Sequence, residues 1–476
     1  MSPNAGTGLV NLPTELIQMI ATLVPEDADL CRMARTCRYL AEAIIPPNSG
    51  VWRTRFLDKY DHPPPDKTSE EVRIEYKVRG IMLAQTPSFL NGEGSKEKLW
   101  LSVLTTLFVE AYNASPNQQG DEACDSRNHA QIKGAIISSD FLNRPIVGND
   151  LNSPIIPSRP YLAIQLAATY LALDLRLPFR SLRTDYDLKI VYVCDSTTPV
   201  PRITASDDEE EIDLHQLLHI RNFWKRHLTN PDEDTFYRSY RNIPEIMRPK
   251  TWEEGFGNEN SLENRWLGYY SCIHPLPITS TDLQERQTCA DLTSHWESTC
   301  ALSLKLSTIT TKASTTWFPI LNEVYPINNH IHPSSRTYFR GTQSLDNHDH
   351  HAHDTNDANE ESYPHPIRGF TETCPAQAGI PGWRRVCFVI YEINPEFFVS
   401  GVDGSGNGNS NEHDDGNDEE DEEEGWLPWS WTTIDFLWAY GYEGMIVPGG
   451  AIMMGRWRNM LAEAEAEAGP FIFWAI

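Results

Sequence analysis

The stretch between residues 9 and 60 constrains the fold of this chain more than any other. Its first part predicts a helix that begins near Pro13, because proline suits a first helical turn, where its missing N–H would have no partner. Pro25 ends this segment, and the apolar residues within it recur at the spacing of one helical face: Leu16, Ile17, Ile20, Leu23 and Val24. A second apolar series predicts two more helices between residues 27 and 44. Three helices this short bury little surface, so we expect an apolar face that a partner or further chain covers.

The motifs of this stretch resemble an F-box. They are Leu12-Pro13, Glu15-Leu16-Ile17, Asp29-Leu30, Ala34-x-Thr36-Cys37-Arg38-x-Leu40 and Trp52-Arg53-x-Arg55-Phe56. The resemblance implies that residues 9–60 bind a Skp1-type adaptor and, through it, a cullin–RING ubiquitin ligase. It also assigns adaptor contact, or the core beneath that contact, to Leu12, Pro13, Leu16, Ile17, Ile20 and Leu40. The alternative is an unrelated small helical bundle in which these residues form only the core.

Composition and charge exclude several classes of protein. The chain has 476 residues, 40% of them hydrophobic, which is enough for two to three domains with a real core. A formal net charge of −28 argues against nucleic acid as a partner, because such a partner requires a basic face. The longest apolar run, residues 161–173, is too short to cross a bilayer, so we expect no membrane partner.

The cysteines favour a reducing compartment, either the cytoplasm, the nucleus or both. There are nine, without CxxC pairs, so neither a disulfide framework nor a zinc site is expected. The first eight residues are polar and small, and they do not resemble a signal peptide.

The rest of the chain predicts an α+β protein. Residues 61–179 form a helical linker region with helices at 69–83, 96–112, 129–142 and 161–173. Residues 180–476 form a mostly antiparallel β domain with one helix at 214–228, and whether its strands close into a barrel stays open. Its β-like runs are 188–194, 265–273, 301–309, 337–340, 386–393, 442–454 and 471–476, with Pro448-Gly449-Gly450 as a hairpin turn.

Two inserts, 345–363 and 400–425, interrupt this domain. The first is rich in His, Asp and Asn, and residues 401–424 contain eleven acids without a lysine or arginine. Neither has the apolar content to form a core, so both are expected to be flexible loops without a metal site.

No sequence motif of a catalytic site is present, so we expect neither catalytic residues nor a cofactor. Aromatic residues are dense near the end of the chain. Five residues there are candidates for binding a target protein, since Trp, Tyr and Arg are over-represented in recognition surfaces: Trp438, Tyr440, Tyr442, Arg456 and Trp457. The alternative is that they fill the core of the β domain.

Segments 266–272, 338–342, 382–388, 442–457 and 469–474 resemble the C-terminal region of F-box proteins from filamentous fungi. The two resemblances together imply a substrate receptor of an SCF-type (Skp1–cullin–F-box) ubiquitin ligase. Such a receptor is not itself an enzyme; it holds an unknown protein target near a ubiquitin-loaded enzyme. Two alternatives remain, namely an F-box scaffold outside a ligase and a ligand-binding or enzymatic β domain with an appended F-box.

Overall fold

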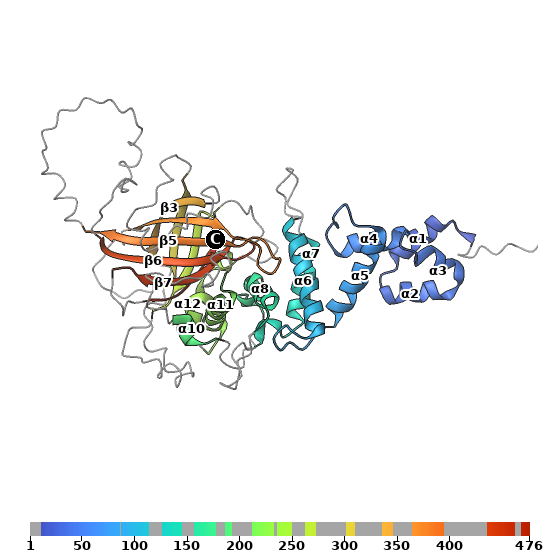
Figure 1. Ribbon diagram of the computed structural model, residues 1–476, viewed down its shortest axis with the longest axis horizontal. Helices are drawn as coiled ribbons and strands as arrows, with labels where there is room; N and C mark the ends of the chain where they lie inside the picture. The colour runs from blue at the N-terminus through green and yellow to red at the C-terminus, as the bar shows by residue number, and fades with distance from the viewer. Residues whose placement is uncertain are drawn as a thin grey trace, which may run out of the picture. The chain divides into compact units, whose positions relative to one another are not determined.

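Helices occupy the first half of the chain and strands most of the second half (Figure 1). The computed structural model describes residues 11–85, 87–113, 126–144, 157–177, 186–192, 212–232, 236–249, 262–272, 301–309, 336–345, 364–394, 436–461 and 468–476, and all structural statements concern these residues. The chain divides into two units, Met1–Phe141 and Leu142–Ile476, which are described separately.

The first unit is helical. The three helices expected between residues 9 and 60 are present as α1, α2 and α3, and a fourth, α4, follows them. The helices predicted at 69–83 and 96–112 are confirmed as α5 and α6, and the one predicted at 129–142 as α7 followed by a short 3-10 turn. The bounds are α1 (Thr14–Leu23), α2 (Asp27–Thr36), α3 (Arg38–Ile44), α4 (Gly50–Lys59), α5 (Ser69–Ala84), α6 (Ser95–Asn113) and α7 (Arg127–Ile137), and the turn η2 (Phe141–Asn143) begins at the last residue of this unit.

A buried charged cluster joins α4 to the helices that follow it. The guanidinium of Arg79 on α5 lies over the rings of Phe56 and Tyr60, with 5.1 and 4.9 Å between its Cζ and the ring centroids. The same group donates hydrogen bonds to Glu75 and to Glu110 of α6. Because the N–H donors of a guanidinium point outward in its plane while its flat face can stack on rings, one arginine can bind rings and carboxylates at once.

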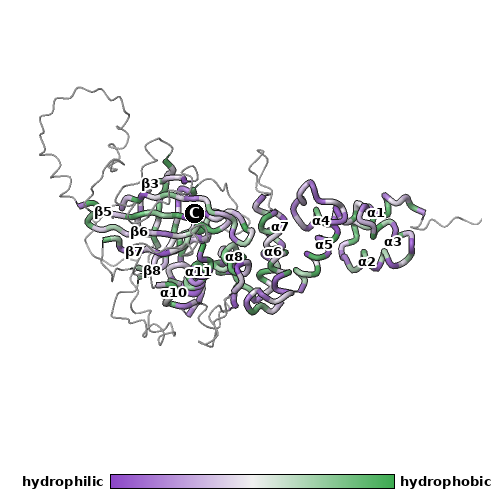
Figure 2. Tube along the Cα trace, viewed as in Figure 1, coloured by the Kyte–Doolittle hydropathy of each residue, from purple (hydrophilic) through white to green (hydrophobic). Residues whose placement is uncertain are grey.

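The second unit contains further helices, whose bounds are α8 (Arg159–Ala167), α9 (Thr169–Ala172), α10 (Leu188–Tyr192), α11 (Leu214–Thr229), α12 (Phe236–Asn242) and η3 (Glu245–Met247). The helix predicted at 161–173 is confirmed as α8, labelled in Figure 2, and α9, and every residue of the two helices from Tyr161 onward is buried. The helix predicted at 214–228 is confirmed as α11. α11 contacts β7 and β8 of the barrel described next, and α10 contacts β8.

One predicted strand is wrong. Residues 188–194 are rich in β-branched side chains, but the chain forms the helix α10 there. The helical turn places Leu188 and Val191 on one side, where both are buried, and α10 contacts α11. Tertiary burial therefore overrides the β propensity of this short segment.

The strands form a closed antiparallel barrel in which each strand pairs with its neighbours in sequence, β1-β2-β3-β4-β5-β6-β7-β8. β8 also pairs with β1, with Trp266 opposite Ala475, so the described strands leave no open edge. The bounds are β1 (Arg265–Tyr270), β2 (Leu302–Thr308), β3 (Arg336–Leu345), β4 (His365–Thr373), β5 (Arg384–Ile393), β6 (Phe436–Ile446), β7 (Ile452–Asn459) and β8 (Ala468–Ala475).

The β-like runs from residue 265 onward are confirmed as strands, and β4 is an additional strand that the sequence did not predict. The hairpin predicted at 442–454 is confirmed as β6 and β7, whose turn contains Gly449 and Gly450 at φ +98° and +73°. Positive φ favours glycine, and a Cβ at Gly449 would also lie 2.5 Å from the hydroxyl of Tyr170. The two predicted inserts lie outside the described residues, apart from Leu345 at the end of β3.

Aromatic contacts identify the interior face of the barrel. Phe388 of β5 contacts Tyr442 of the neighbouring β6 at 4.6 Å between centroids, but it also contacts Phe471 and Phe473 of β8 at 6.0 and 6.4 Å. Because β5 and β8 are not neighbours, these rings meet across the interior. Alternation along each strand then assigns every second residue to the inside.

Candidate functional site

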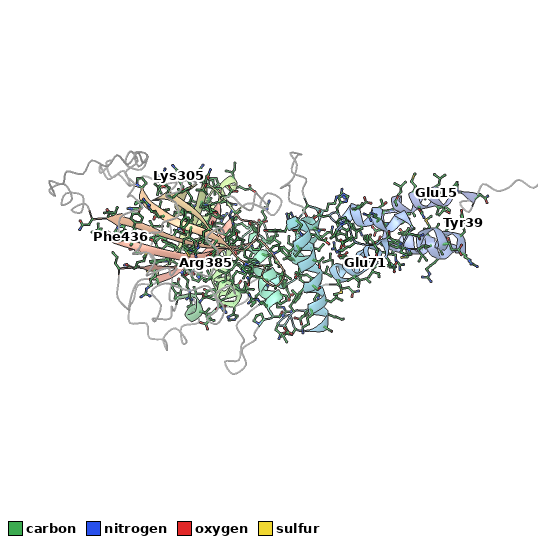
Figure 3. All side chains as sticks on the ribbon, turned by 45° about the horizontal axis from the view of Figure 1, so that its top comes forward. Glu15, Tyr39, Glu71, Lys305, Arg385 and Phe436 are labelled. Carbon is green, nitrogen blue, oxygen red and sulfur yellow. The ribbon has the colours of Figure 1, made fainter. Side chains whose placement is uncertain are left out.

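The first candidate site is a face of α1. The helix is held from below by buried Ile17 and Ala21 and by a hydrogen bond from Gln18 Nε2 to Ala43 O at 3.1 Å. Its N-terminal end is fixed by the hydroxyl of Tyr39, labelled in Figure 3, which donates to Leu12 O at 2.8 Å. One bond is donated by α1 and the other by α3, and both link the two segments, so α1 is held in place against α3.

The opposite side of α1 exposes four apolar side chains, Leu16, Met19, Ile20 and Leu23, which we call the α1 face. Their exposed fractions are 43%, 61%, 36% and 78%, and their spacing of three and four places them on one side of the helix. Single exposed apolar residues are normal on a protein surface, but a contiguous stripe indicates an interaction surface.

The six residues that the F-box resemblance singled out fall into two groups. Leu16 and Ile20 belong to the α1 face, Pro13 at its start is exposed, and Leu12 is half-buried. Ile17 and Leu40 are buried beneath it, with exposed fractions of 0% and 6%. Met19 and Leu23 belong to the α1 face but were not among the six predicted residues, although each lies three residues after a predicted one, Leu16 and Ile20, and this spacing could have identified both.

The second candidate site is one end of the barrel, where β1, β3, β5 and β7 finish. Four side chains are half-buried there, and we call them the aromatic rim: Tyr270, His365, Trp438 and Tyr440. Trp457 lies below them and is buried.

Ring contacts link these residues into a chain. The centroid of His365 lies 4.8 Å from that of Trp438, and Trp438 lies 5.2 Å from Tyr440. Trp457 then meets Tyr440 and Tyr270 at 5.3 Å each, with interplanar angles of 90° and 89°. Edge-to-face contacts of this kind are favourable and orient each ring.

The structure brings together four of the five target-binding candidates. Trp438, Tyr440, Tyr442 and Trp457 all face the inside of the barrel. Tyr442 lies deeper, where burial raises the pKa of its phenol well above the usual value and keeps it neutral. Arg456 is separate from them: it is buried on the outer face, opposite Glu443 in the β6–β7 ladder.

The outer face of strands β3 to β6 carries alternating positive and negative side chains. The Arg385 side chain, labelled in Figure 3, lies with its Nη2 at 2.7 Å from Glu443 Oε1, and Arg336 Nε lies 3.2 Å from Glu372 Oε1. These pairs join β3 to β4 and β5 to β6, and Arg456, opposite Glu443 in the ladder, lies on this outer face and not at the aromatic rim.

A carboxylate completes the rim. The indole N–H of Trp438 donates to Glu392 Oε2 at 2.5 Å, and the two residues are opposite each other in the β5–β6 ladder. Glu392 was not among the predicted site residues, because its role depends on the register of β5 against β6.

Among the described residues, no group of three or more His, Cys, Asp or Glu side chains is placed to hold a metal ion. Within the same part of the chain, no helix is both long and apolar enough to cross a membrane.

Comparison with known proteins concerns the part of the chain that carries the first candidate site. Residues 9–58 match the family model described as F-box-like, which covers α1, α2, α3 and all but the last residue of α4. The chain shows no significant similarity to a curated protein or to a solved structure. The α1 face thus lies within an F-box-like domain.

Proposed function

We propose that this chain, which carries an F-box-like domain at residues 9–58, is the substrate-receptor subunit of an SCF-type ubiquitin ligase. F-box domains generally bind Skp1-type adaptors. The observation that carries the proposal is the coincidence of this domain with an exposed apolar stripe on α1, a surface that an adaptor would cover.

In this proposal the chain acts by positioning. The F-box-like domain binds the adaptor, and the adaptor connects the chain to a cullin and a RING protein. The β barrel binds a target protein and brings one of its lysines close to a ubiquitin-loaded enzyme. Holding two reactants together can supply much of a rate enhancement, so the chain itself needs no catalytic residue. The proposal includes a location in the cytoplasm or the nucleus, and kinship with fungal F-box proteins in the barrel region.

The test is binding of a purified Skp1-type adaptor to the full chain, measured by interferometry. We expect Leu16→Asp and Leu23→Asp to abolish binding, since each places a charge in an apolar contact. The matched control is Ile81→Asp on α5, because Ile81 is 60% exposed but lies outside the F-box-like domain.

Thermal unfolding at the same temperature as the parent would show that the variants are correctly folded. Retained binding by both α1 variants, or equal loss in the control, contradicts the assignment of the α1 face. Adding the cullin and RING subunits separates the ligase from the scaffold, because a scaffold would capture the adaptor without recruiting a cullin.

A further inference from the structure

The topology of the barrel sends four connections to the end that bears the aromatic rim. In an antiparallel barrel with neighbouring strands joined in sequence, β1, β3, β5 and β7 all run in one direction. Their links to the next strands therefore leave from the same end. These links are residues 271–301, 346–364, 394–435 and 460–467.

Nearly all the net charge of the chain belongs to these four links. They contain 26 acidic residues and one basic residue, Arg286, which gives a formal charge of −25 out of −28 for the whole chain. The three links at the other end, 309–335, 374–383 and 447–451, contain one acidic and one basic residue. One end of the barrel is thus tethered to a large negative charge, and the other is neutral.

The described side chains at the acidic end suit a cation. The rings of Trp438, Tyr440 and Tyr270 are half-buried, so part of each can contact a partner. Ring faces attract ammonium and guanidinium groups, and tryptophan does so most strongly. Glu392 adds a carboxylate that the indole N–H of Trp438 holds at the rim.

We propose that the aromatic rim is the target-binding site and that it takes lysine or arginine side chains from a basic segment of the target protein. This inference rests on the proposed function, which requires a target, and it specifies the chemistry of that target. The charge of the links attracts a basic segment over a distance and speeds encounter. The rings and Glu392 then bind individual cationic side chains at short range.

The same charge disfavours other partners. A nucleic acid would be repelled, because it carries a dense negative charge of its own. An acidic peptide would be repelled for the same reason, which provides a clean control.

The experiment uses the full chain and two fluorescent peptides of equal length, one of alternating lysine and glycine and one of alternating glutamate and glycine, with binding followed by anisotropy. The parent is expected to bind the lysine peptide and not the glutamate peptide. Trp438→Leu keeps an apolar side chain but removes the ring, and we expect it to weaken binding about 2- to 30-fold. Glu392→Gln keeps the size of the side chain and removes its charge, and it should weaken binding without disturbing the fold.

The matched control is Leu437→Ala, since Leu437 is 57% exposed on the same strand but faces the outside. Loss of binding in Trp438→Leu and Glu392→Gln, with Leu437→Ala like the parent, supports the proposal. Equal binding of both peptides contradicts it, and so does unchanged binding of the lysine peptide in both rim variants, which would mean that the acidic links act without the rim.

Adaptor binding is measured on the same variants. If the rim variants fail with the peptide but capture the adaptor normally, the two sites are independent, as proposed. If the parent captures the adaptor and binds neither peptide, only the inference about the rim fails. If the parent does not capture the adaptor but its peptide binding depends on the rim, the proposed function fails and the rim remains a cation-binding site.

Discussion

The guanidinium of Arg79 and the carboxylate of Glu110 meet at 2.6 Å, with both side chains more than nine-tenths buried. This pair joins α5 to α6, and Asn128 of α7 donates to the other oxygen of Glu110 at 3.0 Å. Since Arg79 also lies over Phe56 and Tyr60, the pair connects the F-box-like domain to the helices that follow it.

Removing one member of this pair should destabilise the helical unit. Glu110→Ala leaves the buried guanidinium of Arg79 with one carboxylate fewer, and we expect a loss of about 3–5 kcal/mol in the free energy of unfolding. Urea unfolding would measure it. Arg38→Ala is the control, because the Arg38–Glu42 pair on α3 is exposed and should contribute nothing measurable. Equal effects of the two changes would contradict the role of the buried pair.

Stability and adaptor binding should separate on α1. Ile17→Ala removes a fully buried side chain, so we expect it to cost about 2–5 kcal/mol of stability. Leu23→Ala changes a side chain that is 78% exposed, and its effect on stability should be within about 0.5 kcal/mol. Thermal unfolding should show the larger loss of stability in Ile17→Ala. Adaptor binding, corrected for the folded fraction, should show the larger loss in Leu23→Ala.

Gly369 should not tolerate alanine. A Cβ there would overlap the ring of Phe339 and lie 2.7 Å from the carbonyl oxygen of Cys387, so the barrel interior would have to shift. We expect Gly369→Ala to destabilise the barrel by about 1–3 kcal/mol. Gly80→Ala on α5 is the matched control: nothing lies within 4 Å of its Cβ, and alanine favours helix, so that change should be neutral or stabilising.

His219 should make the second unit sensitive to acid. Burial lowers its pKa from 6.5 to about 3, and the neighbouring His215 ring adds to the effect. The unfolded chain therefore binds a proton that the folded chain does not. Stability from this group is fully present above pH 6.5 and is lost as the pH falls toward 3, by at most about 1.4 kcal/mol per pH unit.

The variant His219→Asn tests this pH dependence. The side-chain oxygen of asparagine can accept the hydrogen bond that Asp187 N donates to His219 Nδ1 at 2.9 Å, but it does not titrate. Unfolding measured across the acidic range should show a shallower loss of stability in the variant. Parallel curves for variant and parent would contradict the prediction.

The described cysteines should differ in reactivity. Cys31 is exposed, whereas Cys387 is buried. At Cys374, burial raises the pKa of the thiol to about 12. Because the thiolate is the reactive form, iodoacetamide at neutral pH should modify Cys31 long before Cys374 or Cys387. Peptide mass spectrometry after timed alkylation would show the order, and early modification of Cys387 would mean that the barrel opens readily.

Local patterns predicted much of the fold, and long-range pairing explains most of what they missed. The α1 helix and strands such as β2 follow from the spacing of apolar residues within a few turns or steps. β4 was missed because Pro366 and Gly369 interrupt its alternation, although neighbours on both sides pair with it. Closure of the barrel depends on β1 meeting β8, which no local pattern records.

The candidate sites show the same limit. The F-box motifs predicted the position of the α1 face, but the separation of exposed Leu16 from buried Ile17 required the packing of α3. In the barrel, the aromatic residues were found from their density alone. Whether each of them faces the interior or the outside of the barrel depends on the alternation of side chains along its strand, which places Trp457 inside and its neighbour Arg456 outside.

The pairing of β1 with β8 also sets an order of events during synthesis of the protein. The ladder joins Trp266 to Ala475, about two hundred residues apart, so it cannot form until β8 has left the ribosome. The helical unit precedes the barrel in the chain and can fold earlier, since domains generally fold as units. An adaptor could thus bind a nascent chain whose barrel is still open. Until β8 pairs with them, β1 and β7 have unpaired edges that can pair with other chains and cause aggregation.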